Sequence, residues 1–213
     1  MIALQDPPSS TAGRSSWRID PAASRVEFSI GKRVMLVKKL TVNGRFSNVG
    51  GSVEFDPSNP ANSRALVKVE AASLDTSDPL APVPALDATQ SHMRDAHLRQ
   101  ADFFDVANHP YLIFESTAVE ARHGASYRIH GLLTVKDVTR PIVLDGAYAL
   151  QDGVLAVTAR ARLNRHDFGL SWSNLALRIA DEFEIRIALR ATPEAPQYTG
   201  DPIGRPATAA QTS

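Results

Sequence analysis

Three side chains of metal-binding type lie close together in the sequence, at His92, Asp95 and His97. If the segment is helical, His92 and Asp95 lie roughly 60° apart around the helix axis, whereas His97 lies roughly 140° from His92. Helical metal ligands use spacings of three or four residues, which bring both side chains onto one face. The spacing favours an ordinary helix surface, and a metal enzyme or hydrolase built on these residues is the less favoured alternative.

A second polar run, Asn164–Asp167, has the residue types of an acid/base site, and it equally suits a loop at the rim of a β-barrel. The chain contains no cysteine, which removes thiolate catalysis and cysteine-ligated metal centres. It also lacks a Gly-x-Ser-x-Gly turn, a phosphate-binding loop and a dinucleotide fingerprint. We therefore expect a protein that is not an enzyme and has no metal or other cofactor.

Length and charge narrow the function classes further. The 213 residues carry 23 basic and 23 acidic side chains, and this balance argues against a nucleic-acid partner. No apolar run reaches the roughly 20 residues of a membrane-spanning helix, and the N-terminus has no basic start followed by an apolar stretch. We expect a cytoplasmic protein with one domain over residues 17–191, between disordered tails at residues 1–16 and 192–213.

One segment reads as a helix that leads into a strand. Helix formers dominate Met93–Ala101, and Asp87 with Gln90 three residues later resembles an N-terminal capping pair. Asn108, His109 and Pro110 should end the helix before a strand begins at Tyr111. The adjacent Phe103 and Phe104 near its end suit a plug for the open end of a hydrophobic enclosure.

Almost all the remaining chain alternates apolar and polar residues with the period of a β-strand. Asn43-Gly44 could form a bulge or turn inside the second of these segments, and the proline-rich residues 73–88 predict an irregular connection. Hairpin turns are expected at residues 122–124 and 151–153. The nine predicted strands are Ser24–Ile30, Val34–Phe46, Ser52–Asp56, Ala65–Ala72, Tyr111–Ala121, Ser126–Val135, Thr139–Leu150, Val154–Leu163 and Arg178–Leu189.

Long alternating strands without helical crossovers must pair antiparallel and close on themselves to hide their apolar faces. We therefore predict an all-β fold, an elongated eight-stranded antiparallel barrel built from about nine strand segments and capped by one α-helix. Small residues are predicted to face inward at Gly131, Gly146, Ala71, Ala159 and Ala161. They could leave room for one ligand or could fit the taper of a packed barrel.

Four segments resemble the YceI-like family of polyisoprenoid-binding proteins, which have a lipocalin-like shape. The longest is RDAHLRQADFFDVANHPYLIFES, at Arg94–Ser116. Shorter resemblances occur at Trp17–Ile30, Gly131–Leu144 and Ala161–Leu170, so that the similarity covers Trp17–Ala191. The chain departs from the family pattern at residues 31–41, GKRVMLVKKLT, where the family has a more polar stretch, and in lacking the export signal of many members.

The resemblance implies a barrel whose apolar tunnel holds a long isoprenoid lipid, such as a polyprenyl phosphate or an isoprenoid quinone, for transport, storage or sequestration by a monomer or homodimer. Arg94, Arg165 and His166 are candidates to meet the lipid head group at the mouth. The alternative is a packed barrel that acts through its surface as a stress-response or scaffolding module. The side chains expected to line the tunnel are Phe28, Leu36, Val67, Val69, Phe103, Phe104, Phe114, Ile129, Leu133, Leu144, Val157, Phe168, Trp172, Phe183 and Ile185.

Overall fold

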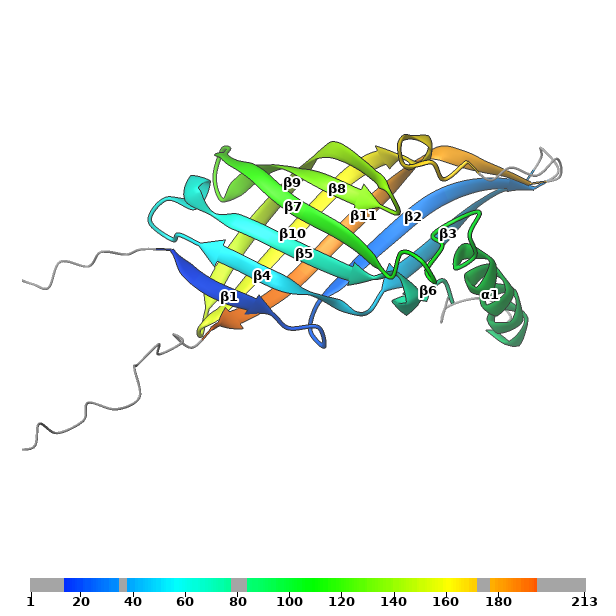
Figure 1. The fold of residues 1–213 in the computed structure, drawn as a ribbon, viewed down its shortest axis with the longest axis horizontal. Helices are drawn as coiled ribbons and strands as arrows, with labels where there is room; N and C mark the ends of the chain where they lie inside the picture. Colours follow the sequence, from blue (N-terminus) through cyan, green and yellow to red (C-terminus); the bar gives the residue numbers. More distant parts are fainter. Residues whose placement is uncertain (1–13, 35–37, 78–83, 172–176, 195–213) are drawn as a thin grey trace, which may run out of the picture.

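Alternation of apolar and polar residues along the strands produces one continuous antiparallel sheet that curls into an elongated barrel (Figure 1). The computed structural model describes residues 14–34, 38–77, 84–171 and 177–194, so most of both predicted tails lies outside the described residues. The strands are β1 (Ser15–Ile19), β2 (Arg25–Val34), β3 (Lys38–Phe46), β4 (Val49–Phe55), β5 (Arg64–Glu70), β6 (Leu74–Asp75), β7 (Tyr111–Ala121), β8 (Ser126–Val135), β9 (Val138–Gln151), β10 (Val154–Asn164) and β11 (Leu177–Pro193).

The barrel closes where β1 pairs with both β4 and β11. Eight strands form the ring, in the order β1-β4-β5-β7-β8-β9-β10-β11, which confirms the predicted antiparallel barrel. β2, β3 and β6 continue the sheet beyond β11. The first residues of β11 pair with β2 but not with β10, so β2, β3 and this part of β11 form a projection past the ring (Figure 1).

The region of the second predicted strand differs from the expectation. Val34 ends β2, and β3 begins only at Lys38, so Val34–Phe46 is not one strand. Asn43 and Gly44 lie inside the regular β2–β3 pairing and form neither a bulge nor a turn. The glycine has a packing role instead, because a Cβ at Gly44 would lie 2.3 Å from Cζ of the Phe28 ring.

The hairpin turn predicted between β9 and β10 is confirmed. Asp152 and Gly153 both have positive φ, at 50° and 72°, which is the geometry of the tight turns that match strand twist. Two short strands were missed, because β1 has five residues and β6 has two. β6 lies inside the proline-rich connection, where the sequence predicts irregular structure.

The one α-helix among the described residues, α1, spans Pro84–Leu98 and lies at the barrel end away from β1 (Figure 1). Asp87 is therefore inside the helix, and the predicted capping pair is wrong. Pro84 suits this start because proline is tolerated in the first helical turn, where the missing N–H costs nothing. The helix also ends earlier than expected, and turns that include Asp105, at a φ of 48°, lead into β7. No helix in the described part of the chain is long and apolar enough to cross a membrane.

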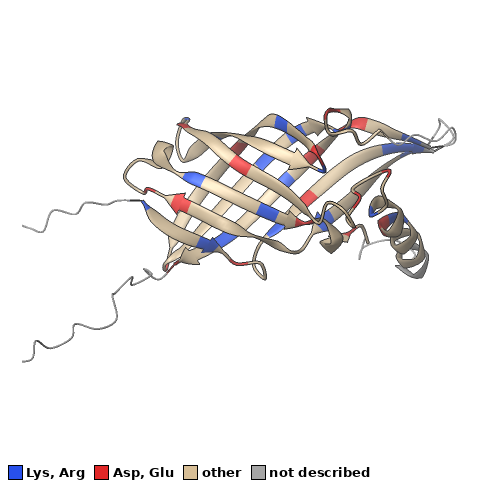
Figure 2. Cartoon of the chain, viewed as in Figure 1, with Lys and Arg blue, Asp and Glu red and all other residues tan. Residues whose placement is uncertain are grey.

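Charged side chains form a belt across the outer face of the sheet. Seven successive strand pairings place these side chains opposite one another, and six of the seven pairings join opposite charges. Cross-strand pairs of this kind stabilise a sheet by about 0.2–1 kcal/mol each and help to fix its register. The belt, which contributes to the mixed blue and red in Figure 2, consists of Glu120, Arg128, Asp145, Arg160, Arg186, Glu27, Arg45 and Asp75.

Gly131→Ala tests how closely a phenylalanine packs on β8. An added Cβ at Gly131 would lie 2.4 Å from the Phe114 ring and 2.6 Å from the backbone oxygen of Glu115, which cannot rotate away. We expect the free energy of unfolding to fall by about 1–3 kcal/mol in chemical denaturation. The control is Gly50→Ala, whose Cβ would meet nothing within 4 Å, so its effect should be small. Equal effects of the two substitutions would contradict this packing.

Candidate functional site: an apolar cavity inside the barrel

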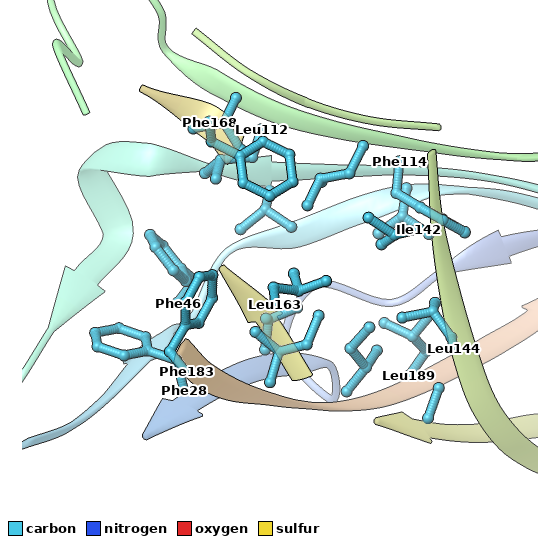
Figure 3. A pocket seen from close by; sticks show the side chains of 18 of the residues that line it. Phe28, Phe46, Leu112, Phe114, Ile142, Leu144, Leu163, Phe168, Phe183 and Leu189 are labelled. Atoms are coloured by element: carbon cyan, nitrogen blue, oxygen red, sulfur yellow. The ribbon is translucent and has the colours of Figure 1, made fainter. Parts of the chain in front are cut away.

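The barrel encloses a cavity of about 680 Å³, within the usual size range of small-molecule sites. Its walls come from β2, β3, β4, β5 and β7 to β11, and from one face of α1. Figure 3 shows phenylalanine rings and branched aliphatic side chains from several strands that point into the same space. The surface that a ligand would meet is therefore almost entirely hydrocarbon.

Four phenylalanines form a connected row near the helix. The rings of Phe28 and Phe46 lie 6.0 Å apart between centroids, those of Phe46 and Phe104 lie 5.8 Å apart, and those of Phe103 and Phe104 lie 5.4 Å apart. Edge-to-face and tilted contacts of this kind are favourable beyond simple area burial. The row joins β2 and β3 to the segment after α1, so Phe103 and Phe104 lie on the cavity wall, where the sequence placed a plug.

A second aromatic group lies at the opposite end of the cavity. Phe55 of β4 packs across the barrel against Tyr148 of β9 at 4.8 Å, and Trp17 packs on Phe55 at 6.4 Å. Tyr148 also pairs with Tyr127 at 5.2 Å. A hydrogen bond with Tyr127, together with burial, raises the pKa of Tyr148 above its usual value. This end therefore holds neutral phenols.

One face of α1 lines the cavity. The residues on this face are three or four positions apart in the sequence, a spacing that places side chains on the same side of a helix. Hydrogen bonds between α1 and Thr76 attach the helix to the sheet. Arg94 donates from Nε to Thr76 Oγ1 and from Nη2 to Thr76 O, both at 2.7 Å, and the Asp95 carboxylate accepts from Thr76 N and Oγ1. Arg99 donates to backbone carbonyls of η2 (Ala71–Ser73) and β6. The helical residues on the cavity wall are Gln90, Met93, Arg94, His97 and Leu98.

The predicted lining residues can be compared directly with this wall. Leu36 and Trp172 lie outside the described residues. The structure brings the other thirteen together around one cavity, as Phe28, Val67, Val69, Phe103, Phe104, Phe114, Ile129, Leu133, Leu144, Val157, Phe168, Phe183 and Ile185. Their contact with a ligand stays a prediction.

The three head-group candidates have different surroundings. Arg94 lines the cavity near α1 while it binds Thr76. Arg165 is buried and lines the cavity, but its guanidinium donates to Leu170 O at 2.6 Å, to Ala180 O at 3.1 Å and to the Asp181 carboxylate at 3.2 Å. His166 is exposed, lies outside the cavity wall and donates to Asp181 at 2.8 Å. Arg165 therefore fastens the turn η3 (Arg165–Phe168) to β11.

The helical metal constellation is dispersed in the structure. His92 is exposed, Asp95 binds Thr76, and His97 pairs with Asp102 at 2.8 Å. Within the described residues, no three His, Asp or Glu side chains gather closely enough to hold a metal ion.

Sequence reasoning missed several residues of the wall. Tyr127 and Tyr148 occupy inward positions that alternation indicates, so their faces were predictable although their pairing across strands was not. The helical contribution was also detectable, since Met93 and His97, and likewise Arg94 and Leu98, are four residues apart. The sequence did not indicate the role of Thr76 in holding the helix, because this residue lies in the connection that the sequence predicts to be irregular.

A family model of the YceI-like domain matches residues 17–191. The chain belongs to the YceI-like family. It is 32% identical over 137 residues to a UPF0312 protein of Photorhabdus laumondii, a match that covers 64% of this chain and 62% of that relative. It is 37% identical over 102 residues to a UPF0312 protein of Pseudomonas aeruginosa, covering 47% of this chain and 46% of the relative. The match therefore spans less than two thirds of each relative's length.

Solved structures share the fold of this YceI-like chain. BcnA of Burkholderia cenocepacia has a TM-score of 0.66 and 23% identity, over 82% of this chain and 99% of BcnA. A polyisoprenoid-binding domain from Saccharophagus degradans has a TM-score of 0.58 and 14% identity, over 85% of this chain and 99% of that domain. At these identities the likeness shows a common barrel architecture.

Arg165→Ala should destabilise the ligand-free YceI-like barrel. The substitution removes a buried guanidinium and leaves the carbonyls of Leu170 and Ala180 without this donor, a loss of about 2–4 kcal/mol. Urea denaturation measures it, with His166→Ala as the exposed control on the same turn, for which we expect a much smaller change. Wild-type stability for Arg165→Ala would contradict a fastening role.

Asp181 should make stability depend on pH in the acid range. Hydrogen bonding from His166, with the charge of that histidine and of Arg165, holds the pKa of Asp181 below the ordinary aspartate value of 3.8. The ionised carboxylate thus stabilises the fold above the unfolded pKa, and this contribution is lost as pH falls through the lowered folded pKa. Asp181→Asn should make the fall in stability below pH 3.8 shallower. Acid-dependent denaturation measures the slope, with the exposed neighbour Asp167→Asn as the control.

Proposed function

We propose that this YceI-like protein binds a long-chain isoprenoid lipid, a polyprenyl phosphate or an isoprenoid quinone, in the barrel cavity for transport, storage or sequestration. The observation that carries the proposal is the enclosed cavity of about 680 Å³ with a hydrocarbon wall. Membership of the YceI-like family and the shared fold of the polyisoprenoid-binding domain from Saccharophagus degradans support it.

Apolar burial supplies the driving force. Each buried methylene contributes about 0.8 kcal/mol, so a chain of twenty carbons could gain about 16 kcal/mol before costs. Ordering a flexible tail and immobilising two molecules oppose this gain, so the net affinity is much smaller. A wall with few polar groups holds the tail without chemical reaction, and the protein acts by binding rather than by catalysis.

The polar part of the ligand fits best at the α1 end. Lys32 of β2 and Arg94 and His97 of α1 lie on the wall there. A phosphate would meet three basic side chains at this end, whereas the far end has the tyrosine pair and one arginine, Arg64, on its wall. This assigns the isoprenoid tail to the space between the two aromatic groups.

The packed-barrel alternative is less consistent with the interior. Protein cores are close-packed, with few voids larger than a water molecule. Glycines at positions 44 and 131 receive phenylalanine rings and thus contribute to packing, yet a ligand-sized space persists between the walls. A barrel that acted only through its surface would have no need of that space.

The first experiment is native mass spectrometry of freshly purified full-length protein, with organic extraction of anything bound. A stoichiometric isoprenoid is the expected result. Val157→Trp, which places a large ring in the cavity, should weaken its retention, because Val157 lies on the wall. Thr158→Trp is the matched control, since the next residue of β10 is exposed on the outer face.

Both variants should remain folded by circular dichroism, and only Thr158→Trp should retain lipid as the wild type does. A wild-type protein that is purified without bound lipid, and that also fails to take up added polyprenyl phosphate and isoprenoid quinone, would contradict the proposal.

A further inference from the structure

The projection beyond the ring carries a row of three cations on neighbouring strands. Arg33 of β2 is opposite Arg178 of β11 on one side and opposite Lys39 of β3 on the other. All three side chains are exposed, and none forms an ion pair with an acidic residue within the described parts of the chain. We call these three residues the basic row.

The basic row differs from the charged belt on the same sheet. Most neighbours in the belt have opposite charges, and Arg186, which faces Arg160, has a further partner in Glu184 at 2.8 Å. Like charges directly opposite one another on adjacent strands are destabilising. Along β11 the next acids after Arg178 are Asp181, which binds Arg165 and His166, and Glu182, which is exposed. Within the described residues, no ion pair offsets the electrostatic cost of the basic row.

The position of the row relates it to the cavity. The same projection places Lys32 and Ile179 on the cavity wall, one residue from Arg33 and Arg178 respectively. Two large apolar side chains are exposed in this region: Leu40, which is next to Lys39 and 37% exposed, and Met93 of α1, which is 68% exposed and also lines the cavity. Figure 2 shows blue at the far end of the projection, beside the end that carries α1. Because successive residues of a strand point to opposite faces, the basic row lies on one face of the projection, and Leu40, Lys32 and Ile179 lie on the other. Cations and exposed hydrocarbon therefore occupy opposite faces of the projection at the α1 end of the cavity.

We propose that the basic row docks this protein on the surface of an anionic phospholipid membrane, with the α1 end of the cavity toward the bilayer. Basic side chains near an anionic leaflet attract it, and exposed apolar side chains at the same end of the barrel enter the boundary between head groups and acyl chains. The purpose of docking, the exchange of isoprenoid with the bilayer, rests on the proposed function. Docking itself requires no ligand in the cavity.

A membrane suits this surface better than a nucleic acid does. Three cations on adjacent strands span only about 10 Å, because neighbouring strands lie about 4.8 Å apart. Nucleic-acid binders with strong affinity neutralise about six to ten phosphates, and this chain has a net charge of zero. Exposed methionine and leucine also have no role on a phosphate backbone.

The test is sedimentation of the full-length protein with vesicles. Phosphatidylcholine vesicles are compared with vesicles that also contain phosphatidylglycerol. We expect binding to the anionic vesicles only, and weaker binding as salt is added. The double variant Arg33→Gln/Lys39→Gln should bind about thirtyfold more weakly, at about fivefold per cation. Its melting temperature should equal or exceed that of the wild type, because the substitutions remove repulsion between like charges on adjacent strands.

The matched control is Lys68→Gln/Arg190→Gln. It removes one lysine and one arginine, both exposed, so the change in net charge is identical. Lys68 is on β5, and Arg190 lies near the C-terminal end of β11, twelve residues along that strand from Arg178. It should keep wild-type binding to anionic vesicles. Equal weakening in both double variants would mean that net charge alone drives association, and the proposal would be overturned.

Two further outcomes separate this proposal from the proposed function. If docking is correct, Arg33→Gln/Lys39→Gln loads isoprenoid normally from detergent micelles but slowly from anionic vesicles. If the protein binds anionic vesicles as described but takes up no isoprenoid, the result contradicts the proposed function and supports the docking proposal. A protein that ignores anionic vesicles, or instead binds a mixed-sequence DNA duplex through the basic row, overturns the docking proposal.

Discussion

The pairing of β1 with β11 is the contact on which the rest of the structure depends. Trp17, Arg18 and Ile19 meet residues 191–193 of β11, and this short ladder turns an open sheet into a ring. Arg18 reinforces it through an ion pair with Glu194 at 2.9 Å. Closure removes the free edges of the ring and places every inward side chain on one enclosed surface. The cavity exists because the ring is wider than those side chains can fill.

The two ends of the cavity are formed by different elements and different side chains, so a ligand would meet different chemistry at each end. Tyr127, Tyr148 and Trp17 surround the end near β1, whereas α1 and the projection surround the other. Thr76 holds α1 in place, since it bonds to both Arg94 and Asp95 while almost fully buried. The side chains that first suggested a helical metal site thus serve partly to position the helix.

The pattern of charged side chains on the outer face also changes along the barrel. Along the middle of the barrel, acids and bases face one another across the strands, which stabilises the register without creating a strong field. In the projection this alternation is lost, and Arg33 lies opposite Arg178 on one side and Lys39 on the other. A hydrocarbon interior and a basic, partly apolar α1 end are the features on which the proposed exchange of lipid with a membrane rests.

The sequence by itself indicated the strand-rich fold and the antiparallel closure, because period-two alternation reports which side chains share a face of a strand. The same alternation indicated the inward faces of the strand residues that line the cavity, whereas Phe103, Phe104 and Phe168 lie outside the strands and have no such signal. The sequence also indicated the YceI-like family through Arg94–Ser116. Only the tertiary structure decided the limits of α1, the role of Thr76, and the function of Gly44 and Gly131 as sites for phenylalanine rings. It alone brought Arg33, Lys39 and Arg178 together, because strand register and barrel closure are set by contacts between residues far apart in the chain, which no local pattern encodes.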